Sequence, residues 1–206
     1  MLTLIKRELY DQITYLVLAS LLSLLVIGIM IYTALLDMPD AGFALGAFTL
    51  QGLLVLFCFL GAAQMYSDRA NRISSLLATL AVTRSRILAA RVAAGAIVVL
   101  LTLIPVAVVG VALVDLLAPP LAFHTRMIVE ISATVTLLGF AGYCVGLYMG
   151  WASNKVLLVV GCLVLLVLTL PLFLAKGFGG EAIVILLLLI GAMLVRTWTN
   201  YTSAAL

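Results

Sequence analysis

Long apolar runs separated by short polar stretches make up almost the whole chain. A membrane-spanning helix needs about 20 predominantly apolar residues, and most of these runs reach that length. The pattern predicts an all-α, polytopic membrane protein with a single transmembrane domain over residues 1–206. The six predicted transmembrane helices cover residues 13–36, 43–65, 87–114, 127–149, 156–175 and 181–196.

The first residues of the chain, 1–12, predict an amphipathic helix that precedes the first span. Leu2, Ile5, Leu9 and Ile13 recur at helical spacing, and the charged residues between them fall largely on other faces. Such a helix would lie on the cytoplasmic surface of the membrane. The alternative is a charged N-terminal extension of the first span itself.

Composition supports an integral membrane protein. Hydrophobic residues make up 66% of the 206 positions and charged residues 9%, whereas a soluble domain has about 45–50% and about 25%. Spans and connectors use nearly the whole length, which leaves no room for a sizeable soluble domain. The net charge of +3 gives no reason to expect a nucleic-acid partner, because in membrane proteins the location of Lys and Arg is more informative than their sum.

The location of the basic residues predicts the topology. Nine of the eleven would lie on one side of the membrane: Lys6, Arg7, Arg69, Arg72, Arg84, Arg86, Arg91, Lys155 and Arg196. Only Arg126 and Lys176 would lie on the other side. Basic residues concentrate in cytoplasmic loops, so we expect both termini in the cytoplasm of a bacterial or archaeal cell and the spans in its inner membrane.

The longest polar interruption, residues 66–86, is the predicted cytoplasmic coupling segment. Its interior places Ile73, Leu76, Leu77 and Leu80 at the spacing of one apolar helical face. Thr83 is placed to cap the following helix. The segment is therefore either a solvated basic loop or a short helix that docks a cytoplasmic partner.

A glycine strip and two polar side chains distinguish the spans. The fourth span contains Gly139, Gly142, Gly146 and Gly150. Their spacing of three and four residues lets a neighbouring helix approach closely, either within the chain or, as the less favoured alternative, in a dimer.

Two polar side chains are candidates for the lining of a pathway, Gln51 in the second span and Glu130 near the start of the fourth. Gln51 should face protein or a water-filled path, and Gln64, at the cytoplasmic end of the same span, should be within reach of water. Glu130 is favoured as a boundary residue, with the pathway as its alternative.

The sequence contains no recognisable catalytic or metal-binding motif, so we expect no catalytic or metal-binding residue in this chain. A P-loop, an HExxH motif and a G-x-S-x-G elbow do not occur in the sequence. The single histidine, His124, has no ligand-type neighbours at metal spacing. Cys58, Cys144 and Cys162 fall in apolar runs, where they are expected to be buried small side chains rather than a disulfide framework.

Residues 75–91, SLLATLAVTRSRILAAR, carry a resemblance to the cytoplasmic stretch of type-2 ABC export permeases. In that family a short helix with a leucine pair ends in a pattern like pro-val-ser-arg, followed by an apolar pair and a basic residue. The compact size is similar to that of haem-exporter-type permeases. The coupling residues that the resemblance implies are Ser75, Leu76, Leu77, Leu80, Thr83, Arg84 and Arg86.

The resemblance implies a subunit that is not an enzyme by itself and holds no cofactor. It would export a substrate with ATP hydrolysed by a separate cytoplasmic ABC ATPase, which binds ATP and Mg, and it would pair with a second permease copy or a homologous subunit. The alternatives are a non-catalytic assembly or immunity protein of the membrane and, less favoured, a lipid-modifying membrane enzyme.

Overall fold

The structure is a computed structural model that describes Lys6, Tyr10 and residues 13–35, 39–70, 84–117, 122–151, 160–161, 164 and 180–203. The described part of the chain is all-helical. Its five helices are α2 (Ile13–Leu35), α3 (Pro39–Ala70), α5 (Arg84–Leu117), α6 (Ala122–Trp151) and α8 (Gly180–Ser203).

Within the described residues, four segments are long and apolar enough to cross a membrane: Ile13–Leu35, Ser85–Leu113, Val129–Trp151 and Gly180–Tyr201. α3 has 32 residues, of which the structure describes the side chains of the apolar stretch Gln51–Tyr66, so the predicted second span stays a prediction. The structure therefore supports four of the six predicted spans by length and composition. The predicted span 156–175 and the N-terminal interfacial helix 1–12 lie almost entirely outside the described residues.

The helices extend past the predicted span ends because a helix need not stop at a polar residue. α5 starts at Arg84 rather than 87, and α6 starts at Ala122. The predicted polar connector 115–126 is therefore largely helical, and His124 and Arg126 lie in the first turns of α6. α8 continues past Arg196 to Ser203. α3 begins at Pro39, the helical position at which proline is best tolerated.

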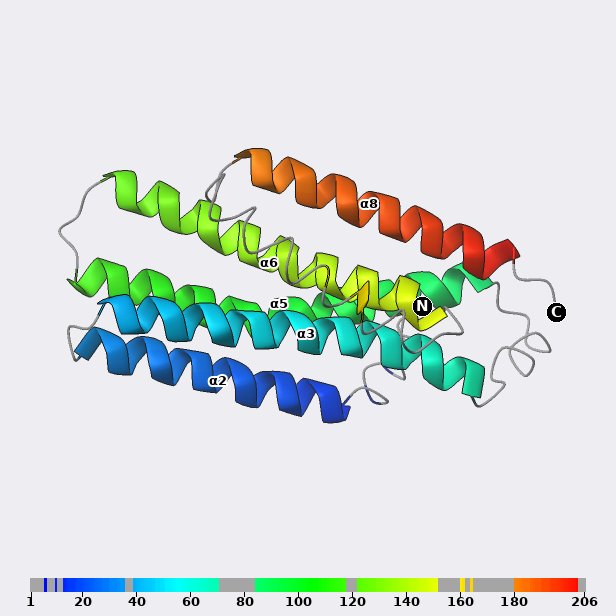
Figure 1. Ribbon diagram of the computed structural model, residues 1–206, viewed down its shortest axis with the longest axis horizontal. Helices are drawn as coiled ribbons and strands as arrows, with labels where there is room; N and C mark the ends of the chain where they lie inside the picture. The colour runs from blue at the N-terminus through cyan, green and yellow to red at the C-terminus, as the bar shows by residue number, and fades with distance from the viewer. Residues whose placement is uncertain are drawn as a thin grey trace.

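The helices lie side by side along the long axis of the molecule (Figure 1). α3 packs on α6, α6 also packs on α8 and α5, and α2 packs on α3 and α5. α6 is the central helix, because 56% of its span is buried, against 17–22% for the other three. The start of α2, the end of α3, the start of α5 and the ends of α6 and α8 gather at one end of the bundle (Figure 1).

α6 and α8 run in the same direction (Figure 1). The end of α6 and the start of α8 therefore lie toward opposite ends of the bundle (Figure 1). The span over 156–175, which would connect them, stays a prediction.

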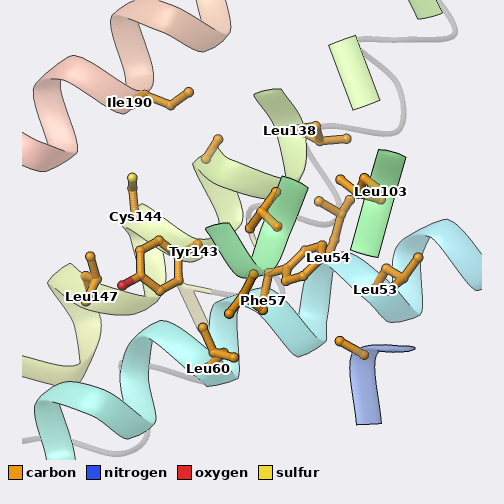
Figure 2. Packing of buried hydrophobic residues seen from close by; sticks show 14 of the residues in the cluster. Leu53, Leu54, Phe57, Leu60, Leu103, Leu138, Tyr143, Cys144, Leu147 and Ile190 are labelled. Atoms are coloured by element: carbon orange, nitrogen blue, oxygen red, sulfur yellow. The ribbon is translucent and has the colours of Figure 1, made fainter. Parts of the chain in front are cut away.

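The apolar core lies where α3, α5 and α6 meet. Figure 2 shows Leu53, Leu54, Phe57, Leu60, Leu103, Leu138 and Leu147 pointing into this region. The outer faces of α2, α5 and α8 expose leucine, isoleucine and valine side chains instead. Exposed apolar faces of this extent suit contact with lipid rather than with water.

Hydroxyl groups within the spans bond to their own helices. Thr33 donates to the carbonyl of Ile29 at 2.9 Å, Thr102 to that of Val98 at 2.8 Å, and Thr197 to that of Met193 at 2.7 Å. Because lipid offers no hydrogen-bond partner, such internal bonds allow polar side chains inside a membrane helix.

The cysteines depart in part from expectation. Cys144 is a buried free thiol, as expected. Cys58 takes part in a disulfide, which contradicts the interpretation of all three as isolated buried side chains. Helix packing decides which thiols come within bonding distance, and spacing along the chain does not reveal it.

Candidate functional site: a buried glutamine–arginine–tyrosine cluster

Three polar side chains from three helices meet inside the bundle. Gln64 comes from α3, Arg91 from α5 and Tyr143 from α6, and their exposed fractions are 8%, 3% and 0%. Buried polar groups require hydrogen bonds, because transfer out of water without a partner is unfavourable by a few kcal/mol. The cluster, defined by these three residues, is therefore a point where α3, α5 and α6 hold one another.

The Tyr143 hydroxyl makes the bonds that join the helices. It lies 2.6 Å from Gln64 Oε1 and 2.9 Å from the backbone carbonyl oxygen of Arg91. A hydroxyl has one proton and can donate to only one acceptor at a time. Two acceptors at these distances thus compete for the same proton.

The orientation of the Gln64 amide resolves this competition. Its Nε2 is buried and has no hydrogen-bond partner. Exchanging the two ends of the amide places the N–H group beside the tyrosine oxygen, which can then accept from it. The result is a chain in which Gln64 donates to Tyr143 and Tyr143 donates to the carbonyl of Arg91. We assign this orientation because it gives the buried Nε2 an acceptor and leaves the tyrosine proton a single acceptor.

Two glycines form the slot that holds the tyrosine. A Cβ on Gly95 would overlap the Tyr143 ring, and a Cβ on Gly61 would overlap the Tyr143 carbonyl oxygen and lie 2.8 Å from the Leu147 nitrogen. Gly95 lies one turn after Arg91 on the same face of α5. The sequence thus supplies both the polar partner and the space for the ring. Phe140 stacks on the ring with centroids 6.1 Å apart.

Arg91 places a guanidinium deep between helices. It is the eighth residue of α5, and its Nη1 lies 3.8 Å from the sulfur of Met65. A buried charge within a span is unfavourable and is found mainly at functional or structural sites. Arg91 is one of the nine basic residues expected on the cytoplasmic side; the structure buries its side chain near the start of α5, and the side of the membrane on which it lies stays a prediction.

Gln64 departs from its expected environment. The sequence predicts it within reach of water at the span end, yet it is buried because α3 continues to Ala70 and packs on α6. Gln51 is half-buried, and its expected contact with protein or a water-filled path stays a prediction. A single chain shows how far a residue lies from a span end, but not which face meets a neighbour.

The glycine strip of α6 lies against α3. Added Cβ atoms at Gly142 and Gly150 would lie 3.2 Å from the Leu54 carbonyl oxygen and 2.6 Å from that of Ala62, and one at Gly146 would overlap the Cys58 carbonyl. Each step of four residues from one glycine to the next on α6 corresponds to a step of four residues on α3. α3 and α6 are therefore parallel and keep one register along this contact. Close backbone approach of this kind stabilises helix pairs in membranes. The strip therefore serves packing within the chain.

Gly139, the fourth member of the strip, has a different neighbour. A Cβ there would lie 3.0 Å from Leu103 and 3.2 Å from Phe57. Both are side-chain atoms, so this glycine makes room for the core between α3, α5 and α6.

The predicted pathway residues lie apart from each other and from the cluster. In the register of α3 against α6, Gln51 lies beside Gly139. Gly139 is nine residues after Glu130 on α6, a distance of roughly 13 Å along the helix. Gln51 precedes Gln64 by 13 positions, and Glu130 precedes Tyr143 by 13 positions, which is roughly 20 Å along each helix. Glu130 is half-buried, and its backbone carbonyl accepts from Thr134 at 2.6 Å.

Most of the predicted coupling residues lie outside the described residues: Ser75, Leu76, Leu77, Leu80 and Thr83. Arg84 is the first residue of α5, and the side chain of Arg86 is exposed. The structure therefore places only the two ends of the 66–86 segment, residues 66–70 in α3 and 84–86 in α5, at the end of the bundle where α3 ends and α5 begins (Figure 1).

A second contact ties α6 to α8 at the same end. The rings of Trp151 and Tyr201 pack edge to face with centroids 5.3 Å apart. Tyr201 is 4% exposed, so this ring is part of the core. The last turns of α6 and α8 are thereby held together.

The chemistry available in the cluster is hydrogen bonding and positive charge. Among the residues that the structure describes, no three His, Cys, Asp or Glu side chains gather as metal ligands. Comparisons of the chain with protein-family models, with curated proteins and with solved structures found no match. The functional argument therefore rests on the residues and their geometry.

Proposed function

We propose that the chain is the membrane-spanning permease subunit of an ABC exporter and works with a separate ATP-binding subunit in the cytoplasm. The observation that carries the proposal is the attachment of both helices that flank residues 71–83. α3 ends at Ala70 and α5 begins at Arg84, and both are bonded to the central helix through Tyr143. A segment joined in this way can transmit a push from a cytoplasmic partner to the core.

Charge supports the same assignment. The described basic residues Arg86 and Arg196 lie on the parts of α5 and α8 that reach the end of the bundle where the 71–83 segment is attached (Figure 1). Under the positive-inside rule this end faces the cytoplasm, where an ATP-binding subunit would be. The proposal further includes a second permease copy or homologous subunit and location in the inner membrane.

Co-purification tests the proposal directly. The neighbouring reading frames would be searched for a Walker A motif, and the chain would be tagged, expressed together with any protein that carries one, and extracted in mild detergent. We expect a stable complex whose ATP hydrolysis differs from that of the isolated ATP-binding protein. Recovery of the chain without any ATP-binding protein, under conditions that preserve its fold, would favour an assembly or immunity protein, and turnover of lipid by the chain alone would favour a membrane enzyme.

Cysteine labelling tests the topology on which the proposal depends. In a cysteine-free background, single cysteines at Asp40, His124 and Gly179 are expected to react with a membrane-impermeant maleimide added to intact cells. A cysteine at Ser85 should react only after the membrane is opened. Reaction of the Ser85 variant in intact cells would reverse the topology and exclude a cytoplasmic coupling segment.

A further inference from the structure

The Tyr143 hydroxyl contacts both helices that flank residues 71–83. Gln64 lies six residues before the end of α3, and Arg91 lies seven residues after the start of α5. At 1.5 Å per residue these positions are roughly 9–11 Å inside the bundle. The cluster is thus the first buried polar contact, within the described residues, that a displacement at this end would meet.

α3 and α5 depend on the helices that bridge them for their relative position. They share fewer contacts than any other packed pair of helices in the described part of the chain, whereas α2 and α6 each pack on both. The apolar contacts of the core tolerate small sliding of one helix along another. A hydrogen bond is sensitive to distance and angle, so Tyr143 determines the register of α3 and α5 against α6 more sharply than the surrounding leucines do.

The tyrosine fits closely against the two helices that its hydroxyl bonds. Gly61 of α3 meets the Tyr143 backbone and Gly95 of α5 meets its ring. The hydroxyl therefore keeps both bonds only while α3 and α5 hold this register against α6, and a shift of either helix along α6 would lengthen or break one of them.

We propose that Tyr143 is a positioning residue that acts as a latch: it couples α3 and α5 to α6, so that displacement of the 71–83 segment is passed to the central helix. The Trp151–Tyr201 contact then passes the shift to α8. The role in transmission rests on the proposed function, whereas the latch itself is a property of the chain alone.

Amide hydrogen exchange of the purified chain in lipid nanodiscs tests the latch. Tyr143→Phe keeps the ring and removes the hydroxyl. We expect exchange to become roughly 5- to 100-fold faster together in the peptides of α3, α5 and α6 that contain Gln64, Arg91 and residue 143, because both hydrogen bonds of the hydroxyl, each of ordinary strength, are lost. Unchanged exchange in these peptides would overturn the latch.

Two further variants make the result specific. Tyr148→Phe makes the same chemical change at a half-buried position of α6 outside the cluster, and it should leave the exchange of all three peptides at the parent level. Gln64→Leu removes only the contact with α3, so α3 and α6 should exchange faster while the Arg91 peptide changes less. Equal acceleration by Tyr148→Phe, or an effect of Gln64→Leu confined to α3, would overturn the latch.

The complex with the ATP-binding subunit tests the transmission. Tyr143→Phe is expected to retain the subunit in pull-downs but to lose most of the permease-dependent change in ATP hydrolysis. Parental ATP hydrolysis in this variant would overturn the transmission. If the parent chain binds no ATP-binding subunit, the proposed function fails, and the exchange measurement still decides whether the latch exists.

Discussion

Gly146→Ala is expected to lower the thermal stability of the protein more than any other single methyl addition along the glycine strip. The added Cβ would overlap the carbonyl group of Cys58. The new Cβ is attached directly to the backbone of α6 and meets a backbone group of α3. No side-chain rotation can relieve this overlap, so the two helices must separate. Overpacking of a tight core costs roughly 1–3 kcal/mol, and the close backbone approach here places the change at the upper end of that range.

Two other glycines provide graded controls for this substitution. Gly142→Ala brings the new carbon 3.2 Å from the Leu54 carbonyl, so a smaller shift accommodates it. Gly191→Ala meets nothing within 4 Å, and alanine favours a helix by about 1 kcal/mol over glycine. Melting midpoints in detergent should therefore fall in the order Gly191→Ala, Gly142→Ala, Gly146→Ala. Equal midpoints for the first and last variants would mean that α3 and α6 do not pack as described.

Period and spacing were enough to predict the helices and the strip. Apolar runs indicated α2, α5, α6 and α8 to within a few residues at most ends, because the hydrophobic length of a span is a property of the run itself. Glycines at three- and four-residue spacing likewise mark a close approach wherever they occur in a membrane helix. The sequence does not identify the helix that the strip approaches, because α3 was one of several possible partners.

The polar cluster could not be predicted, because it depends on which faces meet. Gln64, Arg91 and Tyr143 are separated by 27 and 52 positions, and no local pattern links them. Arg91 was assigned to the cytoplasmic face because it follows a basic run, yet the helix that contains it starts at Arg84 and carries it into the core. One available signal was Gly95, four residues after Arg91, since a glycine one turn from a polar residue can leave room for a large side chain.

The pair of substitutions Leu76→Ser and Leu77→Ser is expected to release the ATP-binding subunit while leaving the permease inserted in the membrane. On the proposed function these leucines bury their side chains in a cleft of that subunit. Burial of two leucines contributes about 3–6 kcal/mol, so their loss should weaken binding by a factor on the order of 100 or more. The arginines of the segment remain, and the charge distribution that determines topology is unchanged.

The matched control replaces two leucines with serine at the end of α5 that is farther from residues 71–83. Leu116→Ser with Leu117→Ser replaces two leucines at the end of the helix predicted to face outward, where the proposal has no cytoplasmic partner. The membrane levels of the parent, the Leu76–Leu77 variant and the control variant would be matched by quantitative blotting before the pull-down. The control should retain the ATP-binding subunit and its permease-dependent hydrolysis, and the Leu76–Leu77 variant should lose both. If that variant retains both at equal expression, the basic segment is a solvated loop, and the residue-level argument for an exporter subunit fails with it.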